Sequence, residues 1–142
     1  VVSSSPQVRY PDYYGIDMPR LEEFCVFRAT IELIRERGMN DLLQRVYEAC
    51  KLELLKPKDM MRNCVRDIYK PFSTEEINQK VAEMLRPEGL KTPVELVFQS
   101  IDGLHEAIPN HHGDWYFTGK YPTPGGTKLC NQAFVNYIDR QK

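Results

Sequence analysis

The sequence predicts a mixed α/β fold, because stretches typical of amphipathic helices and a stretch typical of a strand both occur along its 142 residues. The helical signal is the recurrence of apolar residues at intervals of three and four between residues 19 and 89. The strand signal is V-E-L-V-F at residues 94–98, which is β-branched at Val94 and Val97. A chain of this length that is 42% hydrophobic can form one domain with a buried core.

The chain opens with two valines followed by serines and a proline, a pattern typical of the end of a strand and the loop that leaves it. The backbone N–H and C=O groups of a strand need hydrogen-bond partners. Val1 and Val2 therefore predict one of two arrangements. Either they pair with a later strand of this chain, or their neighbouring strands lie upstream.

Three helices are predicted in the first half of the chain. Residues 19–37 carry one apolar stripe, with Pro19 suited to the first helical position and Gly38 to the C-terminal cap. The same periodicity predicts helices over residues 40–55 and 60–69, each followed by a proline that ends it.

A capping box, S-T-E-E at residues 73–76, predicts the start of a fourth helix. Ser73 would cap the first turn and Glu76 would reach back to the cap. This helix ends at Pro87, so residues 39–89 are expected to form short helices separated by prolines.

The elements after residue 90 are shorter. A strand is predicted at residues 94–98, and Ser100 is placed to cap a short helix that ends before Pro109. We interpret W-Y-F-T-G at residues 115–119 as a possible short strand and residues 127–141 as a C-terminal helix.

Charge and composition exclude several functional classes. A formal net charge of −1 gives no electrostatic basis for binding nucleic acid or an anionic membrane. No stretch approaches the ~18 apolar residues that a membrane span needs. With no C-x-x-C pair present, the cysteines are expected to be buried, reduced thiols in a cytoplasmic protein. They are Cys25, Cys50, Cys64 and Cys130.

Motif and spacing reveal no catalytic apparatus, since the G-x-S-x-G, P-loop and G-x-G-x-x-G patterns are all absent. His105, His111 and His112 lie near Asp114 in the sequence. A metal site needs three or four converging ligands, and adjacent histidines point apart on most backbones. We therefore interpret this stretch as a solvated polar loop and predict no metal site.

Two segments resemble a known family. S-S-P-Q-V-R-Y-P-D-Y-Y-G-I-D-M at residues 4–18 resembles the S-S/A-P-P-x-x-x-P-x-x-Y-G-I-D-M/T segment of the glutamine phosphoribosylpyrophosphate amidotransferases. Y-F-T-G-K-Y-P-T at residues 116–123 is similar to C-F-T-G-K-Y-P-T near the C-terminal end of that family. L-V-F-Q-S-I-D-G-L at residues 96–104 also resembles its late strand and helix, and the order of the segments matches.

The resemblance implies an enzyme of purine biosynthesis. The family joins a glutaminase, whose nucleophile is an N-terminal cysteine, to a type I phosphoribosyltransferase domain with an acidic phosphoribosyl loop. Together they form 5-phosphoribosylamine from glutamine and phosphoribosyl pyrophosphate, with Mg²⁺ expected for the whole enzyme. The chain carries neither the cysteine nor the loop, so the resemblance implies a C-terminal portion that has no catalytic residue of its own. Its implied partners are the upstream glutaminase and phosphoribosyltransferase portions, in a homo-oligomer.

The resemblance also narrows the expected fold class to α/β, the C-terminal part of a type I phosphoribosyltransferase fold with a largely helical insertion. Residues 1–38 would end the phosphoribosyltransferase core, and residues 39–89 would be the insertion. Residues 90–142 would carry the late strand, the short helix, the F-T-G-K-Y-P-T loop and the C-terminal helix.

Ligands of open α/β sheets lie beyond the carboxyl ends of the strands, so the resemblance implies a substrate-pocket rim at the first motif. Tyr14 would exclude water from the site of ammonia transfer, and Asp17 would cap the helix. Alternatively, these two residues only hold the loop and cap the helix. Leu96 would lie near the ammonia passage or would simply pack in the core. The implied rim consists of Ser4, Ser5, Pro6, Tyr14, Gly15 and Asp17.

Some members of the family carry an iron–sulfur cluster on cysteines within these motifs. The corresponding positions here are Asp12, Gly113 and Tyr116. Because thiolates are the ligands of such clusters, we predict no iron–sulfur cluster and no other cofactor in this chain. An alternative function stays open: a non-catalytic helical module for protein interaction.

Overall fold

The computed structural model describes residues 1–11 and 20–142, and its fold is mostly helical. Helices cover 58% of the structure, whereas the sheet found in the described residues consists of two strands of two residues each. The predicted fold class, an α/β part of a type I phosphoribosyltransferase fold, is therefore wrong for this chain. The physical reason is that the core is built by helices, while the strand residues Val2 and Val97 remain 81% and 47% exposed.

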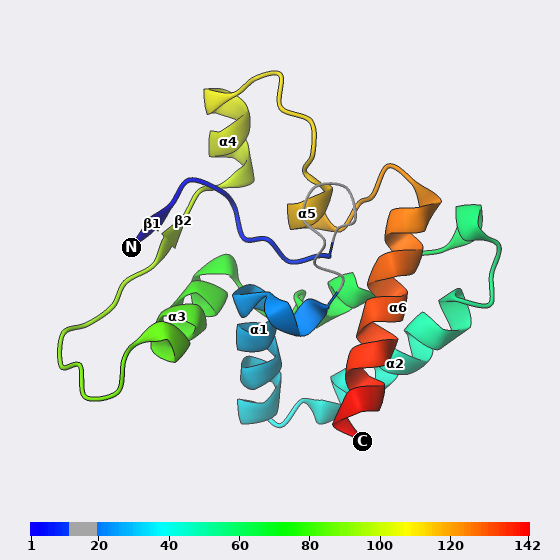
Figure 1. The fold of residues 1–142 in the computed structure, drawn as a ribbon, viewed down its shortest axis with the longest axis horizontal. Coiled ribbons are helices and arrows are strands. Elements are labelled where there is room, and N and C mark those ends of the chain that lie inside the picture. The colour runs from blue at the N-terminus through cyan, green and yellow to red at the C-terminus, as the bar shows by residue number, and fades with distance from the viewer. Residues whose placement is uncertain (12–19) are drawn as a thin grey trace.

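The two strands, β1 (Val2–Ser3) and β2 (Val97–Phe98), pair in parallel. Val2 lies opposite Val97, and Ser3 lies opposite Phe98. The opening valines thus pair with a later strand of the same chain, whereas the resemblance implies that they end a strand of the phosphoribosyltransferase core whose neighbours lie upstream. The predicted strand at 94–98 shortens to two residues, and the small sheet joins the N-terminal end of the chain to the segment between α3 and α4 (Figure 1).

The predicted helix at 19–37 is divided in two. A 3-10 helix, η1 (Leu21–Glu23), is followed by Phe24 in an extended conformation, and α1 (Cys25–Glu36) begins there. Gly38 adopts a φ of +65°, a conformation that glycine permits at low cost, and it lies just after α1 as the sequence predicted.

The next helix, α2 (Asn40–Glu53), matches its prediction, but the following one does not. In its place stand two 3-10 segments, η2 (Lys58–Met60) and η3 (Cys64–Ile68), separated by residues 61–63, of which Met61 and Asn63 are extended. The side chain of Asn63 starts η3 by accepting a hydrogen bond from the Val65 N–H.

Local caps determine where the later helices begin. Ser73 Oγ accepts from the Glu76 N–H at the start of α3 (Thr74–Leu85), and Ser100 Oγ accepts from the Gly103 N–H at the start of α4 (Ile101–Ala107). Glu76 instead directs its carboxylate to Arg37 at 3.2 Å, so the reciprocal half of the capping box is not used.

The aromatic run W-Y-F-T is helical, so the prediction of a strand there is wrong. It forms α5 (Trp115–Thr118), because the N–H groups of Phe117 and Thr118 donate to the carbonyl oxygen of Asp114. Gly119, with a φ of +74°, ends the helix. The last helix, α6 (Pro124–Gln141), begins at its proline, three residues earlier than predicted.

The core lies between these helices in the lower half of Figure 1. Helix α1 packs against α3, and α2 packs against α6. The ring of Phe27 meets Phe134 and Tyr137 edge to face, at centroid distances of 6.3 and 5.0 Å. Burial of a side chain such as Phe27 contributes about 2–3 kcal/mol. Helices from the predicted segments 1–38, 39–89 and 90–142 thus share one core.

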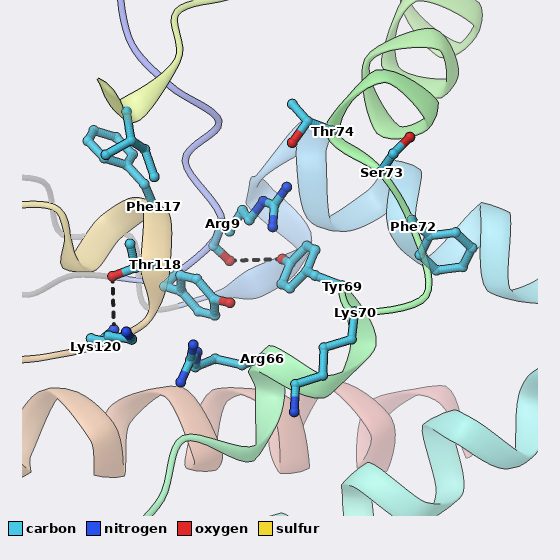
Figure 2. A pocket seen from close by; sticks show the side chains of 12 residues that line it. Arg9, Arg66, Tyr69, Lys70, Phe72, Ser73, Thr74, Phe117, Thr118 and Lys120 are labelled. Atoms are coloured by element: carbon cyan, nitrogen blue, oxygen red, sulfur yellow. Dashed lines mark hydrogen bonds between the residues drawn. The ribbon is translucent and has the colours of Figure 1, made fainter. Parts of the chain in front are cut away.

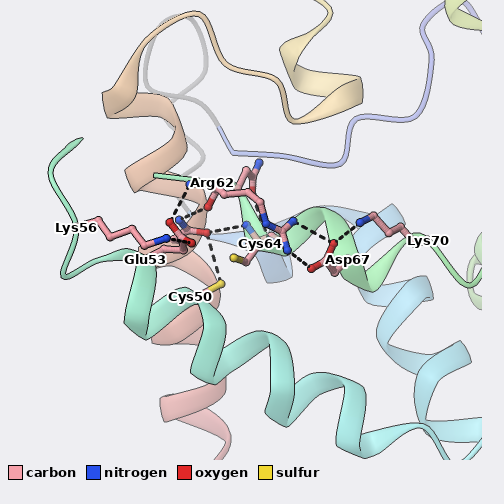
Figure 3. A network of polar contacts seen from close by, with 10 residues as sticks. Cys50, Glu53, Lys56, Arg62, Cys64, Asp67 and Lys70 are labelled. Atoms are coloured by element: carbon pink, nitrogen blue, oxygen red, sulfur yellow. Dashed lines mark hydrogen bonds and ion pairs between the residues drawn. The ribbon is translucent and has the colours of Figure 1, made fainter. Parts of the chain in front are cut away.

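A buried polar network ties α2, η3 and α6 together (Figure 3). Asn131, fully buried, accepts hydrogen bonds from the Cys64 N–H at 3.1 Å and the Cys50 thiol at 3.5 Å. Its amide donates to the Arg62 carbonyl oxygen at 2.9 Å.

Glu53 adds a charged group at the edge of this network. Its carboxylate accepts hydrogen bonds from Lys56 at 2.7 Å and from the Arg62 N–H at 3.0 Å, and these bonds lower the pKa of its carboxyl group.

Candidate functional site

The two segments that resemble the amidotransferase motifs lie side by side in the structure. The N–H of Arg9 donates to the carbonyl oxygen of Tyr116 at 2.9 Å. The hydroxyl of Tyr121 donates to the carbonyl oxygen of Pro11. The late strand joins the same region, since the N–H of Gln99 donates to the Ser5 carbonyl oxygen at 3.2 Å. Three segments that are distant in the sequence therefore meet along one hydrogen-bonded seam.

A pocket of about 490 Å³, here called the basic pocket, opens at this seam (Figure 2). It lies between the N-terminal segment, η3, the start of α3 and α5. Four of its lining side chains are cationic. The lining residues are Arg9, Tyr10, Arg66, Tyr69, Lys70, Phe72, Ser73, Thr74, Ile101, Phe117, Thr118 and Lys120.

Arg9 is held in a fixed position. Its Nε and Nη2 atoms donate to Gln7 Oε1 at 3.0 and 2.7 Å. Gln7 is itself held by α3, because its amide nitrogen donates to Asn78 Oδ1 at 2.6 Å and to the Thr74 carbonyl oxygen at 3.1 Å. The guanidinium carbon lies 4.8 Å from the centroid of the Tyr69 ring, and the Tyr69 hydroxyl donates to the Arg9 carbonyl oxygen at 2.9 Å. This arrangement restricts the rotamers of Arg9 before any ligand binds.

The other cations come from two different segments. Arg66 lies in η3, Lys70 follows two residues after its end, and Lys120 follows α5. Lys70 pairs with Asp67 at 2.7 Å, and Arg62 binds the same carboxylate at 2.6 Å. Burial alone would raise the pKa of Asp67, but the hydrogen bonds from Arg62 and Lys70 hold it below its ordinary value. Asp67 therefore carries its negative charge beside the pocket at neutral pH.

Gly119 permits close packing beside the basic pocket. Its Cα lies so close to its neighbours that an added Cβ would stand 2.8 Å from Asn63 Nδ2, 2.8 Å from Tyr10 Cζ and 2.9 Å from Arg66 Cγ. The Gly119 carbonyl oxygen accepts a hydrogen bond from Asn63 Nδ2 at 3.0 Å. Burial raises the pKa of the neighbouring Tyr10, so its hydroxyl stays protonated at neutral pH.

The predicted pocket rim is described only in part. Pro6 is buried and lines a hollow of about 480 Å³ next to Gln99 and Ile101. The Ser5 carbonyl oxygen accepts a hydrogen bond from the Gln99 N–H, and Ser4 is exposed. Tyr14, Gly15 and Asp17 lie outside the described residues, so their predicted roles remain predictions.

Leu96, the residue predicted to lie near the ammonia passage or in the core, is partly buried and packs against the hydrophobic core. This position agrees with the simpler of its two interpretations.

The structure brings two of the histidines onto one carboxylate. His105 Nε2 lies 2.6 Å from Asp114 Oδ2, and His111 Nε2 lies 3.2 Å from Asp114 Oδ1. The solvated-loop interpretation did not anticipate this convergence, in which His105 of α4 and His111 of the following loop meet the residue that precedes α5. Within residues 1–11 and 20–142, no group of three or more His, Cys, Asp or Glu side chains is arranged to hold a metal ion.

The positions that correspond to cluster cysteines in the amidotransferases have structural roles of their own. Gly113 is buried with a φ of +148°, and Tyr116 accepts the backbone hydrogen bond from Arg9. Asp12 lies outside the described residues. All four cysteines are free thiols, and Cys25 is exposed, contrary to the expectation that they are buried.

Sequence reasoning missed the basic pocket. Arg9, Arg66, Lys70 and Lys120 belong to distant segments, and no spacing rule groups them. The one local signal is the R-x-x-x-K interval at residues 66–70, which is also common on solvated helix faces.

Comparison with known proteins adds no relative: no family model, no curated protein and no solved structure matches the chain. Among the described residues, none of the helices has both the length and the apolar character that crossing a membrane requires.

Proposed function

We propose that the chain is the C-terminal portion of an amidophosphoribosyltransferase-like enzyme, which forms 5-phosphoribosylamine from glutamine and phosphoribosyl pyrophosphate. The observation that carries this proposal is the hydrogen-bonded seam between the two family-like motifs. Arg9 of the first motif donates to Tyr116 of the second at 2.9 Å, and Tyr121 of the second binds Pro11 of the first. Two motifs that serve one site are expected to lie together in the fold, and this contact meets that expectation.

The chain's role in this enzyme is structural. It contains neither an N-terminal cysteine nor an acidic D-D-S/T-x-x-x-G-T loop, so the nucleophile and the Mg²⁺–phosphoribosyl pyrophosphate site belong to upstream portions. Those portions are its proposed partners, in a cytoplasmic homo-oligomer. The seam holds Ser5 and Pro6 beside the late segment at Gln99. We propose that these two residues belong to the substrate-pocket rim, together with Tyr14, Gly15 and Asp17 of the same motif.

The test is growth without purines. The complete gene that encodes this chain is introduced into a strain that lacks amidophosphoribosyltransferase and needs a purine to grow. We expect the complete gene to restore growth and the 142 residues alone to fail, because they contain neither reactive centre. A complete gene product that accumulates and folds without restoring growth would overturn the proposal.

A second function, a non-catalytic helical interaction module, is favoured by one observation. Leu52, Leu55 and Met60, at the end of α2 and in the segment that follows, are 64%, 83% and 68% exposed. Exposed apolar side chains that gather on one surface are typical of contact surfaces, and these three occur within nine residues of the chain. The coding sequence upstream of Val1 discriminates between the two functions. A processed cysteine start and an acidic phosphoribosyl loop support the enzyme, whereas their absence supports the module.

A further inference from the structure

The charge of the basic pocket is not balanced by the part of the protein that the structure describes. Lys70 is paired with Asp67, but Arg9, Arg66 and Lys120 form no ion pair with a carboxylate among residues 1–11 and 20–142. Arg9 is bonded to the neutral amide of Gln7 instead. Three cationic side chains that line one hollow repel one another, and the low dielectric of the walls strengthens the potential inside it. The pocket therefore favours an anion.

The donors are suited to phosphate oxygens. Guanidinium groups bind phosphate through paired N–H bonds, and an ammonium group contributes a mobile point charge. Arg9 is already held by Gln7 and Tyr69, so little side-chain entropy is lost when it binds. Thr118 and Ser73 add hydroxyl groups to the lining, and Ser73 stands at the N-terminal end of the 12-residue helix α3.

The size of the pocket indicates a ligand larger than one phosphate. A volume of about 490 Å³ lies in the range of small-molecule sites. Tyr10, Tyr69 and Phe117 form apolar parts of its wall. We propose that the basic pocket binds a phosphorylated small molecule that carries at least two negative charges, with Arg9, Arg66 and Lys120 as the groups that contact its phosphate oxygens. This inference goes beyond the proposed function and does not depend on it.

The experiment is a calorimetric titration of the 142-residue chain with inorganic diphosphate in low salt, without Mg²⁺. We expect one binding site, with an affinity that falls at least tenfold in Arg66→Gln and in Lys120→Gln. Arg45→Gln on α2 and Lys128→Gln on α6, which replace exposed cations outside the pocket, are the matched controls and should bind as the unaltered chain does. Circular dichroism establishes that each variant is folded, and Lys120 is exposed, so its replacement should not perturb the fold.

Three results would overturn the inference. The first is no binding of diphosphate up to millimolar concentration. The second is equal loss of affinity in the pocket variants and the controls, which would indicate diffuse attraction to the surface. The third is displacement of diphosphate by an oligoglutamate peptide at equal charge concentration, which would indicate an acidic peptide as the ligand. None of these results bears on the growth test of the proposed function, so the two proposals fail separately.

Discussion

Asn63 Nδ2 donates a hydrogen bond of 3.0 Å to the carbonyl oxygen of Gly119, and this contact joins η3 to the end of α5 at the wall of the basic pocket. The backbone can approach so closely only because residue 119 has no side chain. The close packing of the second family-like motif against Asn63, Arg66 and Tyr10 therefore depends on one glycine.

We predict that Gly119→Ala destabilises the protein by about 2–3 kcal/mol, because the new Cβ adds a clash with Tyr10 and Arg66 to the cost of a positive φ. Gly89→Ala is the matched control, since Gly89 has a φ of +81° but open space around it, and it should cost only about 1 kcal/mol. Urea denaturation measures the free energy of unfolding of the two variants. Equal losses would show that Gly119 is not closely packed.

Asn131 is predicted to be the most sensitive polar residue of the core. Asn131→Ala removes the partners of the Cys64 N–H and the Arg62 carbonyl group inside the protein, and it should lower the free energy of unfolding by about 2–4 kcal/mol. Asn136→Ala, on the exposed side of the same helix, should change it by less than about 0.5 kcal/mol. Thermal unfolding of the two variants provides the comparison, and similar melting temperatures would contradict the network in Figure 3.

The carboxylate of Glu53 should make stability depend on pH. Its pKa is lowered in the folded state by Lys56 and the Arg62 N–H, so its contribution is present at neutral pH and is lost as the pH falls through the lowered pKa. Glu53→Gln should therefore cost about 1 kcal/mol at pH 7, a modest value because Lys56 is half exposed, and the difference from the unaltered chain should shrink below about pH 4.

Unfolding curves of Glu53→Gln between pH 7 and pH 3 measure this dependence. Glu48→Gln on the exposed face of α2 serves as the control and should show no comparable change. A Glu53→Gln deficit that grows as the pH falls would contradict the assignment, because the sign of the dependence would be reversed.

The chain is predicted to be colourless when purified under strictly anaerobic conditions. Tyr116 and Gly113 stand where cluster ligands would be needed, and neither offers a thiolate. Absorption spectroscopy together with iron analysis checks this. Stoichiometric iron with visible charge-transfer bands would show that other cysteines of the chain assemble a cluster.

Local signals predicted much of the helical structure. Ser73 and Ser100 cap the helices that follow them, and Gly38 follows α1 in the left-handed region, because each of these features depends on only a few neighbouring residues. The apolar stripes of α1, α2 and α3 were recognisable for the same reason.

The failures arose where tertiary contacts decide the structure. W-Y-F-T has the aromatic content of a strand, yet the Asp114 carbonyl group and Gly119 make it a helical turn. V-E-L-V-F pairs over only two residues, because its partner β1 is equally short. The basic pocket depends on side chains from positions 9, 66, 70 and 120, which only the folded chain brings together.

The most direct test of the account is the reaction itself. The full-length protein encoded by this gene is incubated with phosphoribosyl pyrophosphate and Mg²⁺, and release of diphosphate is measured with and without glutamine. The account predicts diphosphate release that requires glutamine or ammonia and is accompanied, with glutamine, by an equal amount of glutamate. A folded full-length protein that leaves phosphoribosyl pyrophosphate intact in the presence of both glutamine and ammonia would contradict it.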